Sequence, residues 1–411
     1  MAGWLGERLP ETKQSFWDLA VIQLTGLASL PVLASSILLL QRTNFNNAIS
    51  TLVIGNVLLW IIRYAVIKMG HKGRKSTLDI TFDYAGKIGA FFIAIVLLLD
   101  TLAWFVVQTT LASNSLMSLF DLHSSHGINR FIQVSVLIGG LSTLLCMGGV
   151  TWLKKISILS FPVLVVCFIG LLALAPPVVR NTAPMPFSLA GLALILGTNL
   201  GVTADLPTFF RHSKSWEESL RGLTFIQLVT FAIGIGGLFL ARLIDPDLGV
   251  IAGTDGIEKV LLTTLICFSV ICANVANVYS ASVGWELLAP KSLVGRKEYM
   301  ILGFGLTIIF IVLAGVFSLQ TLLNVADASL VNLCFIFLFG YLMRLAIGRS
   351  PQPFEQRVYF MGWLVATLIN VLQYLGLVFT EDSVLVVGVS TILLSIFGGF
   401  ILFETRKRLK D

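Results

Sequence analysis

Long apolar runs, separated by short polar segments, repeat along the whole chain. Twelve runs can be counted, each long enough for an α-helix to cross the hydrocarbon core of a bilayer. They lie at 17–41, 47–69, 86–112, 130–150, 152–175, 187–207, 221–242, 258–284, 298–318, 320–346, 356–378 and 382–403. Because the connections are short, we expect an all-α polytopic membrane protein with twelve transmembrane helices packed in one bundle.

The composition supports a membrane protein without a sizeable soluble domain. Of the 411 residues, 56% are hydrophobic and only 12% are charged, whereas soluble domains average roughly 25% charged residues. The first sixteen residues lack the basic region followed directly by an apolar stretch that marks a signal peptide. We therefore expect a cytoplasmic tail at 1–16 and a second one at 404–411.

The distribution of lysine and arginine predicts the orientation. With a cytoplasmic N-terminus, 22 of the 28 basic residues fall in cytoplasmic segments and 5 fall on the other side. Such an excess on one side is the positive-inside pattern of plasma (inner) membrane proteins, and it places both termini in the cytoplasm. The remaining residue, Arg63, lies inside the second run near its cytoplasmic end, where we expect it to snorkel.

Two runs contain helix-breaking residues at related places. The first holds TGLASLP (Thr25–Pro31) and the sixth holds GTNLGVTADLP (Gly197–Pro207). Glycine weakens a helix, and proline removes a backbone donor. An offset of five spans puts corresponding helices in opposite orientations, which is typical of an inverted repeat with broken helices at a central site. The alternative is that both are ordinary glycines and prolines of membrane helices.

Several stretches resemble a known transporter family. They are LVIGNVLLW at 52–60, TLAWF at 101–105, GVTWLKKISILSFPVLV at 149–165, LALILGTNLG and FFRHSKS at 192–201 and 209–215, NVYSASVGW at 277–285, and LQTLLNVADASL and GYLMR at 319–330 and 340–344. In this order and spacing, the chain resembles the nucleobase–cation symporter family, the group of cytosine permease and the hydantoin transporter. The resemblance implies a leucine-transporter-like fold with inverted repeats at 17–175 and 187–346, then two extra helices at 356–403.

The same resemblance implies a substrate site near the membrane midplane. Trp104 stands where the family has a tryptophan beside the substrate ring, and it lies inside its run rather than at an end, where a belt tryptophan would lie. Three further positions align with substrate-contacting residues of cytosine permease: Thr101 with a glutamine, Gly201 with a serine and Ser269 with an asparagine. The shorter Thr101 side chain weakens the expected edge contact.

Asp100 lies one helical turn before Trp104, on the same face. A carboxylate at this depth is costly, so we expect it to face a cavity or a partner. It could accept a hydrogen bond from a substrate N–H, bind a cation or carry a proton. A cationic substrate such as an amine is one explanation. The alternative is a structural carboxyl group bonded to a neighbouring side chain or backbone group.

Further polar candidates lie on the sixth and eighth runs. Thr198 and Asn199 flank the predicted break, where Asn199 can serve either the substrate edge or free backbone groups. Asp205 is expected to cap the second half-helix. Asn274 lies on a polar stripe of the eighth run and is a candidate substrate contact.

The family's sodium site is expected to be weakened in this chain. In the family, two adjacent hydroxyl residues of the eighth span and carbonyl groups of the first span bind sodium. Here the carbonyl groups near Gly26 and Ser29 remain, but Cys272 and Ala273 replace the hydroxyls and supply no hard oxygen. The coupling ion is then H⁺ or Na⁺.

Two more charged residues carry alternatives. Lys155 can either reach toward the vacant cation site or serve as a cytoplasmic topology charge. Asp327, near the start of the tenth run, is a candidate gate residue. It can equally bond locally to Asn324 and Ser329.

These features predict a secondary active transporter that takes up a small planar nitrogen heterocycle by alternating access. The rival within the same fold is a proton-coupled amino acid or amine transporter. A channel would need a continuous polar pore, and an enzyme would need a catalytic constellation, for which Asp100 and Asp205 lie at different expected depths. We expect no enzymatic activity, cofactor, metal site or nucleic-acid partner. The expected partners are the substrate, the coupling cation and the lipid bilayer.

Overall fold

The computed structural model describes residues 13–27, 29–121, 127–175, 187–241, 256–288, 296–313, 319–379 and 384–408. These residues form helices and contain no β-strand. The helices are α1 (Phe16–Ile22), the π-helical turn η1 (Gln23–Leu27), α2 (Ser29–Arg42), α3 (Phe45–His71), α4 (Thr77–Leu119), α5 (Gly127–Cys146), α6 (Gly149–Leu174), α7 (Leu189–Phe210), α8 (Trp216–Leu240), α9 (Ile257–Leu288), α10 (Arg296–Leu313), α11 (Leu319–Ile347), α12 (Pro353–Tyr374) and α13 (Val384–Arg408).

Each of the twelve apolar runs corresponds to a helix or, for the first run, to a bent set of helices. Among the described helices, α3 to α9 and α11 are long and apolar enough to cross a membrane. The pair α1 and α2, joined by η1, passes the same test as one bent span. The chain is therefore a multi-pass membrane protein. That α10, α12 and α13 also cross the membrane stays a prediction.

The predicted break in the first run is present. The segments Phe16–Gly26 and Pro31–Leu40 are bent by 54° relative to each other. At this bend η1 packs directly on the backbone of α9. A Cβ atom added to Gly26 would lie 2.8 Å from the backbone nitrogen of Ala273, so only glycine permits the approach.

The sixth run differs from the prediction, because α7 continues without a non-helical residue through Gly197–Pro207. Polar side chains bond back to the carbonyl groups of the preceding turn. Thr198 Oγ1 donates to the carbonyl of Leu194 over 2.9 Å, and Thr203 Oγ1 donates to that of Asn199 over 2.8 Å. Pro207 leaves the carbonyl of Thr203, four residues before it, without its helical donor. The next carbonyl, that of Ala204, accepts a hydrogen bond of 2.9 Å from Thr77 Oγ1 on α4.

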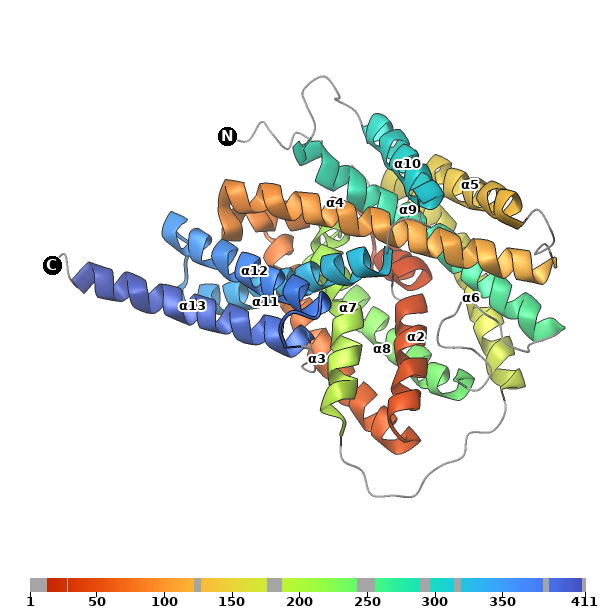
Figure 1. The fold of residues 1–411 in the computed structure, drawn as a ribbon, viewed down its shortest axis with the longest axis horizontal. Helices are drawn as coiled ribbons and strands as arrows, with labels where there is room; N and C mark the ends of the chain where they lie inside the picture. The colour runs from red at the N-terminus through yellow and green to blue at the C-terminus, as the bar shows by residue number, and fades with distance from the viewer. Residues whose placement is uncertain are drawn as a thin grey trace.

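The longest helix, α4, has a kink at one glycine. Gly86 adopts φ 70° and ψ −177°, a left-handed conformation that favours glycine. The kink separates an amphipathic first part of α4 from the apolar part, which begins where the sequence predicts the third span. The single long ribbon of α4 in Figure 1 therefore contains one predicted membrane span and a preceding amphipathic segment.

Four pairs of helices that are separated by five spans pack against each other. The contacting pairs are α2 with α7, α3 with α8, α4 with α9, and α5 with α10. The most extensive contact of all is between α4 and α9, which cross the middle of the bundle in Figure 1. An antiparallel two-fold relation between two five-helix halves would produce this pairing. Helices α12 and α13 pack on each other and on α11, and α12 also packs on α4.

Candidate functional site

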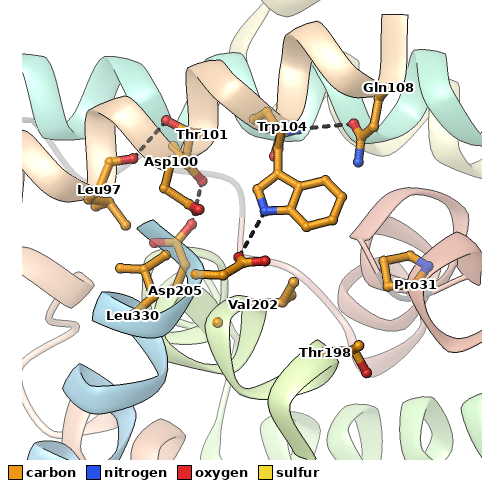
Figure 2. A pocket seen from close by; sticks show the side chains of 14 residues that line it. Pro31, Leu97, Asp100, Thr101, Trp104, Gln108, Thr198, Val202, Asp205 and Leu330 are labelled. Atoms are coloured by element: carbon orange, nitrogen blue, oxygen red, sulfur yellow. Dashed lines mark hydrogen bonds between the residues drawn. The ribbon is translucent and has the colours of Figure 1, made fainter. Parts of the chain in front are cut away.

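A cavity lies between five helices near the middle of the bundle. Its wall is formed by α2, α4, α7, α9 and α11, and Figure 2 shows α4 on one side with α7 and α11 opposite. The lining residues are Pro31, Leu97, Asp100, Thr101, Trp104, Gln108, Thr198, Gly201, Val202, Asp205, Asn277, Ser280, Asp327 and Leu330. Six residues proposed for the site from the sequence thus line one cavity: Asp100, Thr101, Trp104, Thr198, Gly201 and Asp327.

One face of α4 supplies the main polar and aromatic groups. Asp100, Trp104 and Gln108 follow each other at intervals of four residues, so they project from the same side of the helix (Figure 2). The indole Nε1 of Trp104 donates a hydrogen bond of 3.0 Å to Oδ1 of Asp327 on α11. This bond fixes the plane of the ring against the cavity. Thr101 instead donates to the carbonyl of Leu97 on its own helix over 2.9 Å.

The carboxyl groups of Asp100 and Asp327 interact across the cavity. Asp100 is only 5% exposed, and its Oδ1 atom has no hydrogen-bond partner among the described residues. Gly201 of α7 faces the same place, because an added Cβ atom would lie 3.2 Å from Oδ1 of Asp327. The glycine therefore leaves room for the Asp327 carboxyl group.

Asp205 is the third carboxyl group of the cavity and has a different environment. It accepts hydrogen bonds from the hydroxyl groups of Ser280 on α9 and of Thr208, the latter over 2.7 Å. Arg211, six residues further along the chain, interacts with it electrostatically. The predicted capping role is not found, because α7 is continuous and Asp205 bonds to side chains rather than to free N–H groups.

Asn199 points away from the cavity toward a buried arginine. Arg63 is 3% exposed and does not snorkel, which corrects the prediction from the sequence. Its guanidinium donates to Asn199 Oδ1 over 3.2 Å, to Thr203 Oγ1 over 3.1 Å and to Gln227 Oε1 on α8 over 2.8 Å. Polar groups of α7 and α8 thus hold the arginine inside the bundle, although its position along α3 suggested an accessible membrane surface.

The candidates on α9 have separate roles. Ser269 and Asn274 are buried and do not line the cavity. Asn274 donates to Thr109 of α4 over 2.8 Å, and Asn277 donates to Gln108 over 3.0 Å. These hydrogen bonds from side-chain amide groups join α9 to α4, the two helices with the most extensive contact. Asn274 therefore connects α9 to α4, whereas Asn277 lines the cavity.

The predicted cation-site region is brought together at the bend of the first span. Gly26 lies against Cys272 and Ala273 of α9. The hydroxyl groups of Thr25, Ser157 and Ser160 lie near the Cys272 thiol, and Ser157 Oγ has no hydrogen-bond partner among the described residues. Oxygen groups are therefore present there, on η1 and α6 rather than on α9.

Two other predicted positions in this region can be placed only in part. Ser29 is the first residue of α2, and its side chain lies outside the described residues. Lys155 is exposed on α6, so it does not reach the cation-site region. Its neighbour Lys154 instead pairs with Asp18 at the start of α1 over 2.9 Å.

Gln108 and Ser280 line the cavity but were not predicted from the sequence. A signal existed for both. Gln108 continues the four-residue spacing of Asp100 and Trp104, and Ser280 lies one helical turn beyond Asn277. The cavity extends further along α4 and α9 than the family resemblance indicated.

No protein-family model matches the sequence, and no curated protein sequence is similar to it. Several solved transporter structures do match the fold. Mhp1, a nucleobase-cation-symport-1 family transporter in a closed conformation with bromovinylhydantoin bound, is 15% identical and gives a TM-score of 0.64 over 96% of this chain and 94% of that chain. The chain has the same fold as these transporters.

Two further structures extend the comparison. A Na⁺-coupled sialic acid symporter in a substrate-bound outward-open state is 14% identical, with a TM-score of 0.65 over 93% of this chain and 89% of that chain. A manganese transporter of Eremococcus coleocola is 14% identical, with a TM-score of 0.60 over 97% and 98%. At these identities the likeness establishes the leucine-transporter-like fold and leaves the substrate open.

Proposed function

We propose that the chain is a cation-coupled secondary active transporter that imports a small planar nitrogen heterocycle, such as a nucleobase or a related vitamin precursor. Transport occurs by alternating access, with one group of helices rocking against the other around the cavity. The observation that carries this proposal is the Trp104 indole, held by Asp327 on one wall of a cavity with amide and hydroxyl groups. The fold of Mhp1, which binds a hydantoin, supports it.

The cavity offers what a flat heterocycle needs. An aromatic ring stacked on the indole face gains about 0.5–1.5 kcal/mol beyond the burial of its area. The side-chain amides of Gln108 and Asn277 can both donate and accept hydrogen bonds at the edge of the ring. Gly201 keeps the opposite wall open, since a side chain there would press on Asp327.

The coupling ion is assigned to H⁺ or Na⁺. A sodium ion prefers oxygen ligands, and the hydroxyl groups of Thr25, Ser157 and Ser160 lie around Cys272, where the family has its cation site. These hydroxyl groups can supply oxygen ligands that Cys272 and Ala273 lack, which supports sodium as the coupling ion.

The test is ligand-dependent stabilisation of the purified protein in detergent. Nucleobases, hydantoins, vitamin precursors and amino acids are compared in sodium and in potassium buffer, because a ligand that binds the folded state raises the melting midpoint by mass action. We expect a heterocycle to raise the midpoint in the wild type and not in Trp104→Ala. Trp152→Ala is the matched control, because Trp152 is exposed on α6 away from the cavity. Stabilisation by amino acids alone would contradict the proposal.

A further inference from the structure

The cavity is acidic, and its charges are unequally compensated. Three carboxyl groups line it, and no basic side chain does so among the described residues. Asp205 is compensated by two hydroxyl donors and by Arg211. Asp100 and Asp327 form no ion pair with any described residue.

The Asp100 carboxyl group lacks the partners that a buried acid needs. It is 95% buried, since only 5% of the residue is exposed, and Oδ1 has no hydrogen-bond partner among the described residues. A buried polar atom without a partner loses its hydration without compensation. Asp100 lines the cavity, so a ligand donor placed beside its carboxyl group could satisfy this oxygen.

The carboxyl group of Asp327 adds a second negative charge beside Asp100. Asp327 lies beside Asp100 and accepts a hydrogen bond of 3.0 Å from Trp104. Two carboxyl groups in contact do not both stay ionised unless a cation lies between them, and without a cation they share a proton. The face of the Trp104 indole is next to them, and aromatic faces attract cations.

The geometry points to a protonated nitrogen as part of the substrate: the transported heterocycle carries an amidinium, aminopyridinium or similar flat cationic group, bound between Asp100, Asp327 and the Trp104 ring. This inference rests on the proposed transport function and narrows its substrate class. A flat cation with two N–H donors meets both carboxyl groups at once. Burial of the charge pair inside the cavity makes the interaction selective against neutral rings of the same shape.

The test uses two pairs of probes that share a shape and differ in charge. Benzamidine and benzamide form one pair, and 4-aminopyridine and 4-pyridone form the other. At neutral pH the first member of each pair is a cation and the second is neutral. Dissociation constants are measured by calorimetry on the full chain in detergent. We expect each cation to bind at least about tenfold more tightly than its neutral partner, a difference of about 1.4 kcal/mol.

Two variants locate the preference. Asp100→Asn keeps the shape of the side chain and removes its charge, so the preference for the cations is expected to disappear. Asp83→Asn is the matched control, because it removes a carboxylate from the same helix, where Asp83 pairs with Lys75 outside the cavity. Its preference is expected to equal that of the wild type. If Asp100→Asn does not fold, Asp327→Asn takes its place, and the wild-type comparison of the probe pairs needs no variant.

The outcomes separate this inference from the proposed function. If neutral planar rings bind as tightly as the cations, the carboxyl pair carries a proton, the inference fails and transport of a heterocycle stands. If no planar heterocycle of either charge binds, both fail. If Na⁺ or Mn²⁺ alone stabilises the wild type and not Asp100→Asn, the pair binds an inorganic cation and the inference is overturned.

Discussion

Two groups of buried charges lie in the bundle and differ in how completely their hydrogen-bonding capacity is used. The α7 network consists of Arg63, Asn199, Thr203, Asp205 and Thr208, and each of its charged groups is bound by several neighbours. In the carboxyl pair, Asp100 and Asp327, Trp104 donates to Asp327 and the two carboxyl groups contact each other, while Oδ1 of Asp100 has no partner among the described residues. The first group joins helices, whereas the second leaves binding capacity for a ligand.

The α7 network is expected to contribute to stability, and the carboxyl pair is expected to contribute to ligand binding. A saturated buried network stabilises one arrangement of helices, because removing a partner leaves the others without hydration. An unsaturated site costs stability and is retained where a ligand completes it. Variants of the α7 network should therefore change the unfolding free energy, and variants of the carboxyl pair should change ligand binding.

The largest effect on stability is expected for Arg63→Lys. The planar guanidinium reaches acceptors on α7 and α8 together, and a single ammonium group cannot reproduce that geometry. We expect a loss of about 2–4 kcal/mol, since buried acceptors without a partner cost about 1–3 kcal/mol each. Thermal melting in detergent without ligand measures it. Arg357→Lys, at an exposed arginine of α12, is the control and should not change the midpoint.

An unchanged midpoint in Arg63→Lys would show that the three acceptors find other partners. The α7 network would then not hold α3, α7 and α8 together, and it would not differ from the carboxyl pair in its contribution to stability.

The second prediction concerns two identical substitutions in the same cavity. Asp205→Asn removes the charge that accepts from Ser280 and Thr208, so we expect a loss of about 1–3 kcal/mol in the unfolding free energy. Asp100→Asn removes a carboxyl group that has an unpaired buried oxygen, so we expect the stability to stay the same or to rise.

Chemical unfolding of both variants without ligand, compared with the wild type, gives the two values side by side. If Asp100→Asn loses as much stability as Asp205→Asn, the Asp100 carboxyl group is structural. The contrast between the two groups would then be wrong.

The positions of the helices could be predicted well from the sequence, and the bend of the first span also. Apolar runs fix where helices lie in a bilayer, because every backbone group must be bonded within its own segment. Trp104 and Asp100 were predicted to share one face because a helix has a fixed period. That they meet Asp327 could not be read from the spacing, since it depends on how α11 packs on α4.

Two predictions from the sequence were wrong for the same physical reason. Arg63 was expected to reach the membrane surface because its depth was judged along one helix, whereas acceptors on α7 and α8 hold it inside. The break in the sixth run was inferred from glycine and proline, whereas α7 stays helical through Gly197–Pro207, where it packs against α2, α3 and α11. The local sequence indicates which conformation a segment favours, and tertiary contacts decide which conformation it adopts.

A smaller effect is expected for Trp104→Phe, which tests the link between the ring and the carboxyl pair. Phenylalanine keeps an aromatic face and loses the Nε1 donor to Asp327. One hydrogen bond contributes about 0.5–1.5 kcal/mol, so the melting midpoint should fall slightly. Ligand affinity should fall less than in Trp104→Ala, because the stacking surface remains. Equal losses in both variants would mean that the hydrogen bond, not the ring face, positions the ligand.

The smallest effect is expected outside the bundle, at the ion pair between Arg349 and Glu355. The pair joins the segment before α12 to its first turn, with Arg349 donating to both oxygens of Glu355 over 2.7 and 2.9 Å. The Arg349 guanidinium and the backbone N–H of Gln352 lower the pKa of Glu355 below its usual value. A lowered pKa in the folded state means that the folded carboxyl group holds its proton less tightly than the unfolded one.

The stability contributed by Glu355 is therefore present above the pKa of the unfolded chain and is lost as the pH falls through the lower, folded pKa. Exposed ion pairs are weak because water screens them. Compared with the wild type, Glu355→Gln should melt slightly lower at neutral pH, and the gap should close in strongly acidic buffer. A gap that persists there would have to come from the N-terminal capping of α12, where Glu355 also accepts from the backbone of Gln352, and not from its charge.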